Sequence, residues 1–369
     1  MSVYDHSRDF SGLPLNTRQF PIPMSLSLPG LGWSPHFQSQ LSVDEFDTLT
    51  PARISQVHRN AVEVITTTGP HRIHLSAEFL QIGVAIGDWV LLSPMLDEIT
   101  RLLDRKTLLQ RRSAAENASA QLIAANVDTL LIVSSCNADY NPARLERYLA
   151  LAHQADIEPI LVLTKVDTRD DPDAFIAGAR LDLPNVQVVA IDATTAAGIS
   201  LLVGFCGAGK TLALLGSSGV GKSTITNALT DAALETQGIR DDDAKGRHTT
   251  TARSMHAIKT GGWLIDTPGM RALRLLDVGE GVDMVFQDVA DLVPLCKFND
   301  CAHETEPGCA VQKAIKDGTL DPKRLARWLK LSAEDAHNSR DLAQAHANAR
   351  STEKKVGGGR AKGKAKRGN

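Results

Sequence analysis

Between residues 51 and 103 the hydrophobic positions form short runs with β-branched and alternating character. Turn signals such as "TTGP" and "IGD" separate these runs, which cover 51–58, 61–67, 71–76, 87–93 and 96–103. A period of two indicates strands that bury one face. Five short strands within roughly 55 residues predict a small barrel of the OB type. Upstream, residues 1–45 are rich in Pro, Ser and Gly, which predicts an irregular arm with a short helix near 35–47.

From about residue 120 the pattern changes to compact apolar runs with helical stretches between several of them. The runs are "VDTLLIVSS" (127–135), "EPILVLTK" (158–165), "VQVVAI" (186–191), "TLALLG" (211–216) and "GGWLID" (261–266). One helical stretch, 144–154, places its apolar residues at helical spacing. Strands that alternate with helices predict a mostly parallel, doubly wound sheet. Residues 253–259 should form a hairpin with 261–266 and supply one antiparallel edge strand.

After about residue 282 the pattern is mainly helical, and 321–350 reads as a helix. The Gly- and Lys-rich end of the chain predicts disorder. The sequence therefore predicts an irregular N-terminal arm (1–45), an OB-fold β-barrel (46–112), an α/β domain (113–281), a mainly helical domain (282–350) and a disordered basic tail (351–369).

Charge is segregated along the chain. The whole chain has a net charge of −3, whereas its last part, from Glu353 to Asn369, has seven basic residues and one acidic residue. An acidic body with a basic tail is typical of proteins that contact nucleic acid, although a solvated tail without a partner has the same composition. No apolar run is long enough for a membrane span, and the N-terminus lacks the order of a signal peptide. These features predict a soluble, cytoplasmic protein that is a monomer.

The stretch "GFCGAGKTLALLGSSGVGKS" (204–223) contains the phosphate-binding pattern G-x-x-x-x-G-K-[ST] twice. The pattern works when a strand leads into a glycine-rich turn and a helix follows, because backbone N–H groups then surround the phosphates. The second copy has the strand 211–215 before it and a helical stretch, 223–234, after it. The first copy leaves only four residues between Thr211 and Gly216, and the strand already needs them. We therefore interpret Gly209-Lys210 as the turn before that strand.

Each residue type in the second copy has a physical role. Lys222 should bridge the β- and γ-phosphates, and the Ser223 hydroxyl should coordinate Mg²⁺. The N–H groups from Gly219 to Ser223 should surround the phosphates. The predicted phosphate site consists of Gly216, Ser217, Ser218, Gly219, Val220, Gly221, Lys222, Ser223 and Thr224.

Three further motifs indicate a guanine nucleotide. In "TKVD", Thr164 ends a strand, the Lys165 methylenes can lie on the base, and Asp167 can accept from the N1–H and N2–H₂ donors of guanine, which adenine lacks. In "IDATTAAG" (191–198) the Ala193 N–H could contact guanine O6. In "DTPG", Asp266 can reach Mg²⁺ through water and the Gly269 N–H can meet the γ-phosphate, although the same letters also form an ordinary turn.

A segment that could close over the γ-phosphate, "GRHTTT" (246–251), lies between the phosphate loop and "DTPG". Thr250, with Thr249 as the alternative, could coordinate Mg²⁺ and the γ-phosphate. The motif order is unusual because the base motif precedes the phosphate loop and "DTPG" comes last. Circular permutation can preserve one spatial site, since domain termini often lie close together. The sequence therefore predicts a circularly permuted α/β GTPase domain.

Three of the five cysteines fall within fourteen residues, in "CKFNDCAHETEPGC". Cys296, Cys301, His303 and Cys309 have the spacing C-x4-C-x-H-x5-C. Three thiolates and one imidazole suit a closed, structural Zn²⁺ site. The helical domain is therefore predicted to bind zinc.

The combination of "GSSGVGKST", "GRHTTT", "DTPGMR", "TKVD" and the zinc spacing resembles the bacterial ribosome small subunit-dependent GTPase A family. The resemblance covers about residues 45–335. It implies a late-acting assembly factor for the small (30S) ribosomal subunit, whose GTPase activity the subunit stimulates. It also implies that the barrel and the zinc domain contact ribosomal RNA. Asp192 stands where the family often has serine.

The residue after "DTPG" is Met270, which cannot position the attacking water as a glutamine would. Slow intrinsic hydrolysis is therefore expected. The family pattern supports His248 as the residue that orients water, against the alternative that it is only a loop residue. Arg247 could offer charge. Two other functions stay open from the residues: an RNA-binding protein that binds GTP but scarcely hydrolyses it, and an ATP-dependent RNA enzyme, which Asp167 disfavours.

Overall fold

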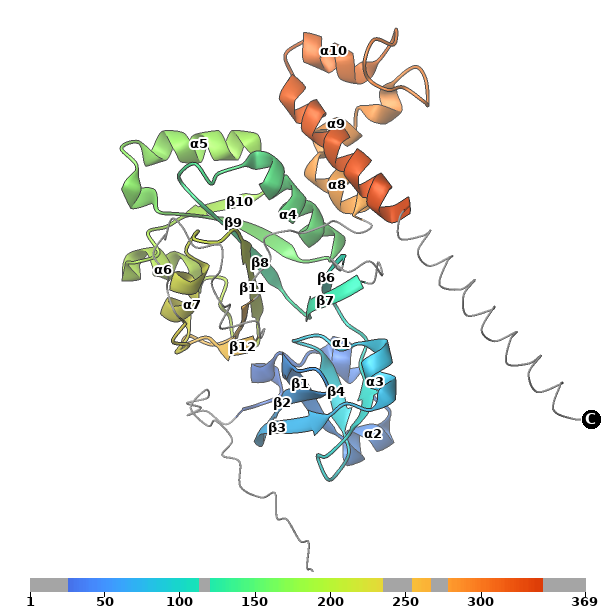
Figure 1. Cartoon of the computed structure of the whole chain (residues 1–369), viewed down its shortest axis with the longest axis vertical. Helices are drawn as coiled ribbons and strands as arrows, with labels where there is room; N and C mark the ends of the chain where they lie inside the picture. Colours follow the sequence, from blue (N-terminus) through green and yellow to red (C-terminus); the bar gives the residue numbers. More distant parts are fainter. Residues whose placement is uncertain (1–25, 113–119, 235–253, 267–277, 341–369) are drawn as a thin grey trace, which may run out of the picture.

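The computed structural model describes residues 26–112, 120–234, 254–266 and 278–340 of the 369-residue chain. Figure 1 shows an N-terminal group of strands in blue, a central α/β unit in green and yellow, and a C-terminal group of helices in orange and red. One 11-stranded sheet runs through the first two units. A separate hairpin of β6 (Leu108–Arg112) and β7 (Ala120–Ala125) lies between them.

Five antiparallel strands form the N-terminal unit. They are β1 (Thr50–Val57), β2 (Ala61–Thr66), β3 (Gly69–His74), β4 (Trp89–Leu92) and β5 (Ile99–Leu102). Strand β1 pairs with β2 and β4, β2 pairs with β3, and β4 pairs with β5. Ile54, Val64 and Val90 are buried in the core between them. The five predicted strands are confirmed, and α1 (Pro35–Gln38), α2 (Val43–Thr48) and α3 (Ala77–Ile82) complete the unit.

Five parallel strands form the centre of the α/β unit, as the alternating pattern predicts. Their spatial order is β10 (Gln187–Ala190), β9 (Glu158–Thr164), β8 (Thr129–Ser135), β11 (Thr211–Gly216) and β13 (Trp263–Asp266). Strand β11 thus lies in the middle of the sheet, although it follows β8, β9 and β10 in the chain. Because all five strands run in one direction, their carboxyl ends meet at one edge of the sheet.

Helices cover both faces of these parallel strands (Figure 1). They are α4 (Pro142–Gln154) and α5 (Pro172–Asp182) on one face, and α6 (Ala196–Val203) and α7 (Lys222–Leu229) on the other. The alternation along β8 explains this layering. Leu130 and Ile132 pack in the same core as residues of α4 and α5, whereas Leu131 and Val133 pack with residues of α6 and α7. A strand that is buried on both sides needs a continuous apolar run, and β8, which is buried along its whole length, has one over residues 130–133.

Strand β12 (Ser254–Ala257) forms the predicted hairpin with β13, but it is not an edge strand. Its other side pairs with β1 of the N-terminal unit, where Gln56 lies opposite Ser254. The prediction of a free edge was wrong because it treated the two units as separate sheets. A shared strand pair satisfies backbone groups that an exposed edge would leave unpaired.

The C-terminal unit packs on α4 through a close helix contact. It contains α8 (Gly279–Val285), α9 (Gln287–Ala290), a 3-10 turn (Val293–Leu295), α10 (Ala310–Lys316) and a further helix over residues 322–340. A Cβ atom on Gly281 would lie 2.1 Å from the carbonyl oxygen of Ala150, so the two helix backbones touch there. The Arg324 guanidinium, from the last helix, donates to both oxygens of Asp288 and to Glu146 on α4.

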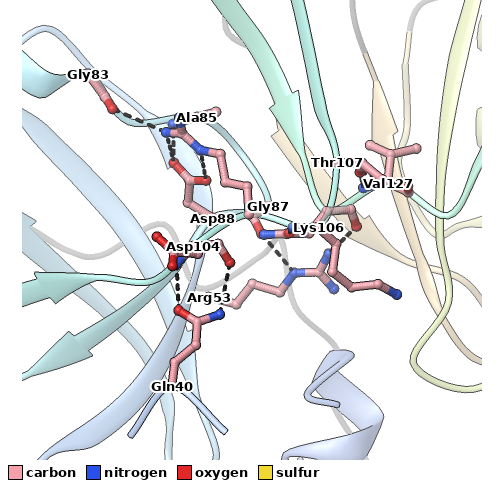
Figure 2. A network of polar contacts seen from close by, with 12 residues as sticks. Gln40, Arg53, Gly83, Ala85, Gly87, Asp88, Asp104, Lys106, Thr107 and Val127 are labelled. Atoms are coloured by element: carbon pink, nitrogen blue, oxygen red, sulfur yellow. Dashed lines mark hydrogen bonds and ion pairs between the residues drawn. The ribbon is translucent and has the colours of Figure 1, made fainter. Parts of the chain in front are cut away.

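Polar contacts hold the N-terminal and α/β units together (Figure 2). On the N-terminal side of this junction the fully buried Asp88 accepts two 2.7 Å hydrogen bonds from Arg105, which precedes the residues that cross to the α/β unit. The backbone N–H of Lys106 donates to the Asn126 side chain, and the Thr107 hydroxyl donates to the carbonyl oxygen of Val127.

Among the helices of the described part, none has the length and apolar character that a membrane crossing needs.

Candidate functional site

The phosphate loop joins the end of β11 to the start of α7, as the second motif copy predicts. Strand β11 ends at Gly216 and α7 begins at Lys222, so the turn consists of 217–221. The first N–H groups of α7 face this turn, and the helix dipole adds positive potential there. The helix is shorter than predicted because it ends at Leu229, where the Thr230 backbone is extended and its hydroxyl donates to the carbonyl oxygen of Thr226.

Two glycines explain why the loop has its shape. A Cβ atom on Gly216 would lie 2.2 Å from the carbonyl oxygen of Val133 on the neighbouring strand. Gly221 has a φ of 97°, a left-handed conformation that side chains rarely adopt, and it precedes the first residue of α7. Both positions therefore need glycine for steric reasons.

The Lys222 ammonium lies across the loop that carries it. It donates to the carbonyl oxygen of Gly216 at 2.8 Å and to that of Ser217. Ser223 and Thr224 follow in the first turn of α7 and are partly exposed, whereas Ser218 and Gly219 are exposed and Val220 is buried. The ammonium and the Ser223 hydroxyl thus stand at the same loop, where a nucleotide would need them.

The "TKVD" segment lies directly beside the phosphate loop. The buried Thr164 hydroxyl donates to the carbonyl oxygen of Val220 at 2.7 Å. Gly221 also packs on Thr164, because its Cβ position is 3.7 Å from the threonine side chain. The structure therefore brings together the predicted base motif and the predicted phosphate loop, which are more than 50 residues apart in the chain.

A tight turn presents the rest of that motif. Lys165 has a φ of 60° and starts a 3-10 helix, Val166–Thr168, on which the Asp167 side chain is exposed. The Thr168 hydroxyl donates to the carbonyl oxygen of Lys165 at 2.7 Å and closes the turn. An exposed carboxylate at the end of β9 is available to accept hydrogen bonds from a ligand.

The loop after β10 holds Ala193, which is buried at 8% exposure. Its neighbour Asp192 accepts from the Thr194 N–H at 2.9 Å and from the Thr194 hydroxyl at 2.6 Å. These hydrogen bonds lower the pKa of the Asp192 carboxyl. Asp192 therefore shapes its own loop, and a serine is not needed for that purpose.

Asp266 is the last residue of β13, which is parallel to β8 and separated from it by β11. Its backbone pairs with Ser254 of β12. The carboxyl end of β13 lies next to the end of β11, so Asp266 is at the edge that carries the phosphate loop. The predicted residues Arg247, His248, Thr249, Thr250, Gly269 and Met270 lie outside the described residues.

The first motif copy lacks the strand–turn–helix arrangement that a phosphate loop needs. Gly209 and Lys210 form the turn before β11, as predicted, and therefore lie at the opposite end of that strand from Gly216. The Lys210 ammonium is 3.3 Å from Asp128, and the Thr211 N–H donates to the same carboxylate at 2.8 Å.

Sequence reasoning missed one contact of the loop. Tyr148 on α4 is 2% exposed and was predicted only as part of an apolar helix face. Burial raises the pKa of its hydroxyl, and a hydrogen bond with the Ser217 side chain opposes that shift. Helix α4 thus touches the phosphate loop on one side and the C-terminal unit on the other, through Gly281. No local signal separates such a tyrosine from an ordinary core residue.

The predicted metal residues converge. The ligand atoms of Cys296, Cys301, His303 and Cys309 all lie within 4.8 Å of one another. The Cys296 and Cys309 sulfurs are 3.9 Å apart, and each is 3.6 Å from the His303 Nδ1 atom. A tetrahedral Zn²⁺ with bonds of about 2.3 Å to sulfur and about 2.0 Å to nitrogen would separate its ligands by roughly 3.5–3.8 Å. The donor set and its spacing therefore fit zinc.

A sheet with the phosphate-loop strand at its centre, a base motif on an earlier strand and "DTPG" on a later one defines a circularly permuted GTPase. The RsgA GTPase family matches residues 102–276. A curated relative from Mesorhizobium japonicum, named small ribosomal subunit biogenesis GTPase RsgA, is 51% identical over 85% of this chain and 92% of its own length. The chain belongs to the RsgA GTPase family, and it is a GTP hydrolase.

Further comparisons agree with this assignment. A relative from Vibrio parahaemolyticus, named small ribosomal subunit biogenesis GTPase RsgA 2, is 45% identical over 89% of this chain and 91% of its own length. The crystal structure of YjeQ from Thermotoga maritima is similar with a TM-score of 0.60 and 26% identity, over 78% of this chain and 98% of that one. The structure of YloQ, described as a circularly permuted GTPase, has a TM-score of 0.56 at 23% identity, over 79% of this chain and 96% of that one. The permuted order predicted from the motifs is confirmed.

Proposed function

We propose that this GTPase assists the late maturation of the small (30S) ribosomal subunit. In this proposal it binds the subunit, hydrolyses GTP to GDP and phosphate with stimulation by the subunit, and then leaves. The observation that carries the proposal is the 51% identity to a relative named small ribosomal subunit biogenesis GTPase, across 92% of that relative. We place the protein in the cytoplasm as a monomer, because its partner would be found there and its proposed site is complete within one chain.

The phosphate end of the nucleotide would bind at 216–224. Lys222 would contact the β- and γ-phosphates, and Ser223 would coordinate Mg²⁺. The position of both residues at the start of α7 supports these roles. Asp266, at the neighbouring strand end, would hold Mg²⁺ through water, and the Gly269 N–H would meet the γ-phosphate.

The base end would bind at the carboxyl ends of β9 and β10. The exposed Asp167 would accept from guanine, Lys165 would cover the base, and the Ala193 N–H would contact guanine O6. The hydrogen bond from Thr164 to Val220 supports this arrangement, since it fixes the base motif relative to the phosphate loop.

For hydrolysis itself, we propose that Thr250 coordinates Mg²⁺ when the segment 246–251 closes, and that His248 orients the attacking water. Strand β12 begins at Ser254, shortly after this segment, and pairs with the N-terminal unit at Gln56. A contact that moves the N-terminal unit would therefore act on the segment through β12.

We also propose that the N-terminal strands form an OB-type barrel and that one structural Zn²⁺ binds Cys296, Cys301, His303 and Cys309. The antiparallel pairing of β1 to β5 supports the barrel, and the ligand spacing supports the zinc site. In the proposed complex both units contact ribosomal RNA, and the basic tail adds a further electrostatic contact. The domain limits that we propose are 1–45, 46–112, 113–281, 282–350 and 351–369.

The test is GTP hydrolysis by the purified protein with and without purified small subunits. We expect strong stimulation by the subunit in the unaltered protein and its loss in Lys222→Ala. Lys259→Ala is the matched control, because that lysine is exposed and pairs only with an exposed Asp231 among the described acidic residues. A turnover rate that small subunits do not change would contradict the proposed function. His248→Ala should bind GTP normally but lose the stimulated rate.

A further inference from the structure

A cavity of about 280 Å³ lies where the N-terminal arm, the N-terminal strands and the α/β unit meet. It includes the Gly209-Lys210 turn of the first motif copy, which the GTP site does not use. Since this turn precedes β11 and the phosphate loop follows it, the cavity lies at the other end of that strand from the proposed GTP site. Its lining comprises Pro29, Gly32, Trp33, Ser34, Phe37, Arg53, Lys106, Asn126, Val127, Asp128, Ala208, Gly209, Lys210 and Thr211.

The charges around this cavity do not balance. Arg53, Lys106 and Lys210 line it, whereas Asp128 is the single acidic residue in the lining. The Asp128 carboxylate is shared, because Lys210 lies 3.3 Å from it and Lys106 lies 3.9 Å from it. Both lysine side chains are about half exposed, which leaves their ammonium groups free to rotate toward a ligand. The lining therefore has an excess of two positive charges.

The third cation, Arg53, is 1% exposed. Its guanidinium donates to the carbonyl oxygens of Leu31 at 2.7 Å, Asn126 at 3.2 Å and Gly87 at 3.4 Å, and to the Thr211 hydroxyl at 2.7 Å. These neutral acceptors take four of the five N–H donors of the guanidinium.

Within the described part of the chain no carboxylate forms an ion pair with Arg53. Burial lowers the pKa of Arg53, and the charges of Asp128 and Asp88 oppose that shift from a distance. Asp128 is shared with the two lysines, and Asp88 is held by the two hydrogen bonds from Arg105 (Figure 2). A buried guanidinium is normally paired with an anion, because an unpaired buried charge is costly. Because Arg53 lines the cavity, an anion bound there would supply a counter-charge for the buried guanidinium.

The N-terminal arm packs closely against one wall of the cavity and supplies the aromatic residues of another. Gly209 has a φ of 73°, and a Cβ atom there would lie 2.3 Å from the carbonyl oxygen of Pro29. The backbone of the arm therefore presses on the turn that carries Lys210. Trp33 and Phe37 form an aromatic wall, with ring centres 5.6 Å apart. Neither wall needs to move for the cavity to exist.

We propose that this cavity binds a phosphoryl group between Arg53, Lys106 and Lys210. Guanidinium and ammonium groups together are the donors that proteins use for phosphate, and an excess of two positive charges matches a phosphate dianion. The volume of about 280 Å³ lies just below the range for small-molecule sites, which is about 300–1,000 Å³. The cavity is therefore large enough for a phosphoryl group with a short substituent and too small for a second complete nucleotide.

The phosphoryl group could belong to a free phosphorylated compound or to the backbone of an RNA strand. The experiment uses the full-length protein saturated with GDP and Mg²⁺, so that the GTP site is occupied. Inorganic phosphate and a single-stranded RNA trinucleotide are titrated separately by calorimetry. We expect saturable binding of at least one probe, with an affinity that falls at least tenfold in the Lys106→Ala, Lys210→Ala double variant.

Lys259→Ala is the control for a lost surface charge and should bind the probe like the unaltered protein. Since Lys106 and Lys210 are exposed at the cavity mouth, the double variant should keep its fold, which circular dichroism verifies. Binding of inorganic phosphate identifies a free phosphoryl ligand, and binding of the trinucleotide alone identifies a phosphodiester. The absence of saturable binding for both probes, or equal affinity in the double variant, overturns the proposal.

Discussion

The Thr164 hydroxyl lies 2.7 Å from the carbonyl oxygen of Val220 and donates a hydrogen bond to it. Both groups are buried, and the bond joins the end of β9 to the turn before α7. In the permuted chain order the base motif and the phosphate loop have no short covalent connection. This hydrogen bond is therefore one of the contacts that fix the two halves of the proposed nucleotide site relative to each other.

Thr164→Val tests that contact, because valine keeps the shape of threonine and removes the hydroxyl. The Val220 carbonyl would lose its partner in a buried position, so we expect a loss of about 1–3 kcal/mol in unfolding free energy. GDP affinity should fall as well, since the phosphate loop loses a hydrogen bond that fixes its position. Denaturant unfolding and GDP titration measure the two effects. Thr48→Val is the matched control, because the exposed Thr48 hydroxyl donates to the carbonyl oxygen of Asp44 in α2, in the N-terminal unit. Equal effects of both substitutions would show that the link to the loop is unimportant.

Gly281→Ala should separate the C-terminal unit from α4. A methyl group there would lie 2.1 Å from the Ala150 carbonyl oxygen, so the helices must move apart. Overpacking of this kind costs about 1–3 kcal/mol. Hydrogen exchange should rise at the contact between α4 and α8. Gly178→Ala, within α5, has nothing within 4 Å of the added Cβ and should stabilise the protein by about 0.5–1 kcal/mol. If the two glycines responded alike, the close helix contact would not limit stability.

The sequence was sufficient for features that depend on local pattern. Alternating and continuous apolar runs predicted the strands, and the requirement for a strand, a turn and a helix selected the second phosphate motif over the first. The cysteine spacing likewise predicted a cluster, because four ligands within fourteen residues can converge without help from the rest of the chain.

Features that depend on contacts between distant segments could not be predicted. The pairing of Gln56 with Ser254 joins two units, and neither strand carries a signal for its partner. Phe37 was placed in an irregular arm, yet it is 1% exposed and packs against Trp89. The role of Arg53 also required the structure, since a single arginine in a strand usually reads as a surface residue.

The Glu146 carboxyl on α4 should make the attachment of the C-terminal unit depend on pH. Burial raises the pKa of Glu146 to about 6, against the attraction of Arg327 and Arg324. The folded state then binds the proton more tightly than the unfolded state, so this group's contribution to stability is greatest at low pH and declines as pH rises through the folded pKa. Between an unfolded value near 4.5 and a folded value of about 6, the change amounts to roughly 2 kcal/mol.

The Glu146→Gln variant should lack this dependence. As pH rises from 4.5 to 6.5, the unfolding free energy of the unaltered protein should fall relative to that of Glu146→Gln. The change in this difference should be at most about 2 kcal/mol. The difference between the neutral carboxyl of Glu146 and the amide of the variant is the same at every pH, and Arg324 keeps its hydrogen bonds to Asp288. Thermal unfolding across this range measures the difference. Glu334→Gln, at the exposed rim of the same interface, controls for loss of a carboxylate that pairs with Arg147. A parallel pair of pH profiles for the protein and Glu146→Gln would refute the prediction.

Metal content tests the proposed zinc site at the level of single ligands. The purified protein should contain one zinc ion per chain, and Cys301→Ser should lose it, because serine is a poor ligand for zinc. The His303 and Cys309 side chains are buried, so their donor atoms would stay close together even without an ion to bind them. Because the folded unit then loses the free energy of metal binding, the C-terminal unit should unfold at a lower temperature. Cys206→Ser is the control for the loss of one thiol, because the Cys206 thiol donates to the Leu202 carbonyl oxygen, away from the cluster. Elemental analysis of the three proteins, followed by thermal unfolding with and without a chelator, provides the measurement. We expect zinc to be lost in Cys301→Ser alone, and the unfolding transition of Cys206→Ser to depend on the chelator. Equal zinc content in Cys301→Ser and Cys206→Ser would contradict the assignment of the cluster.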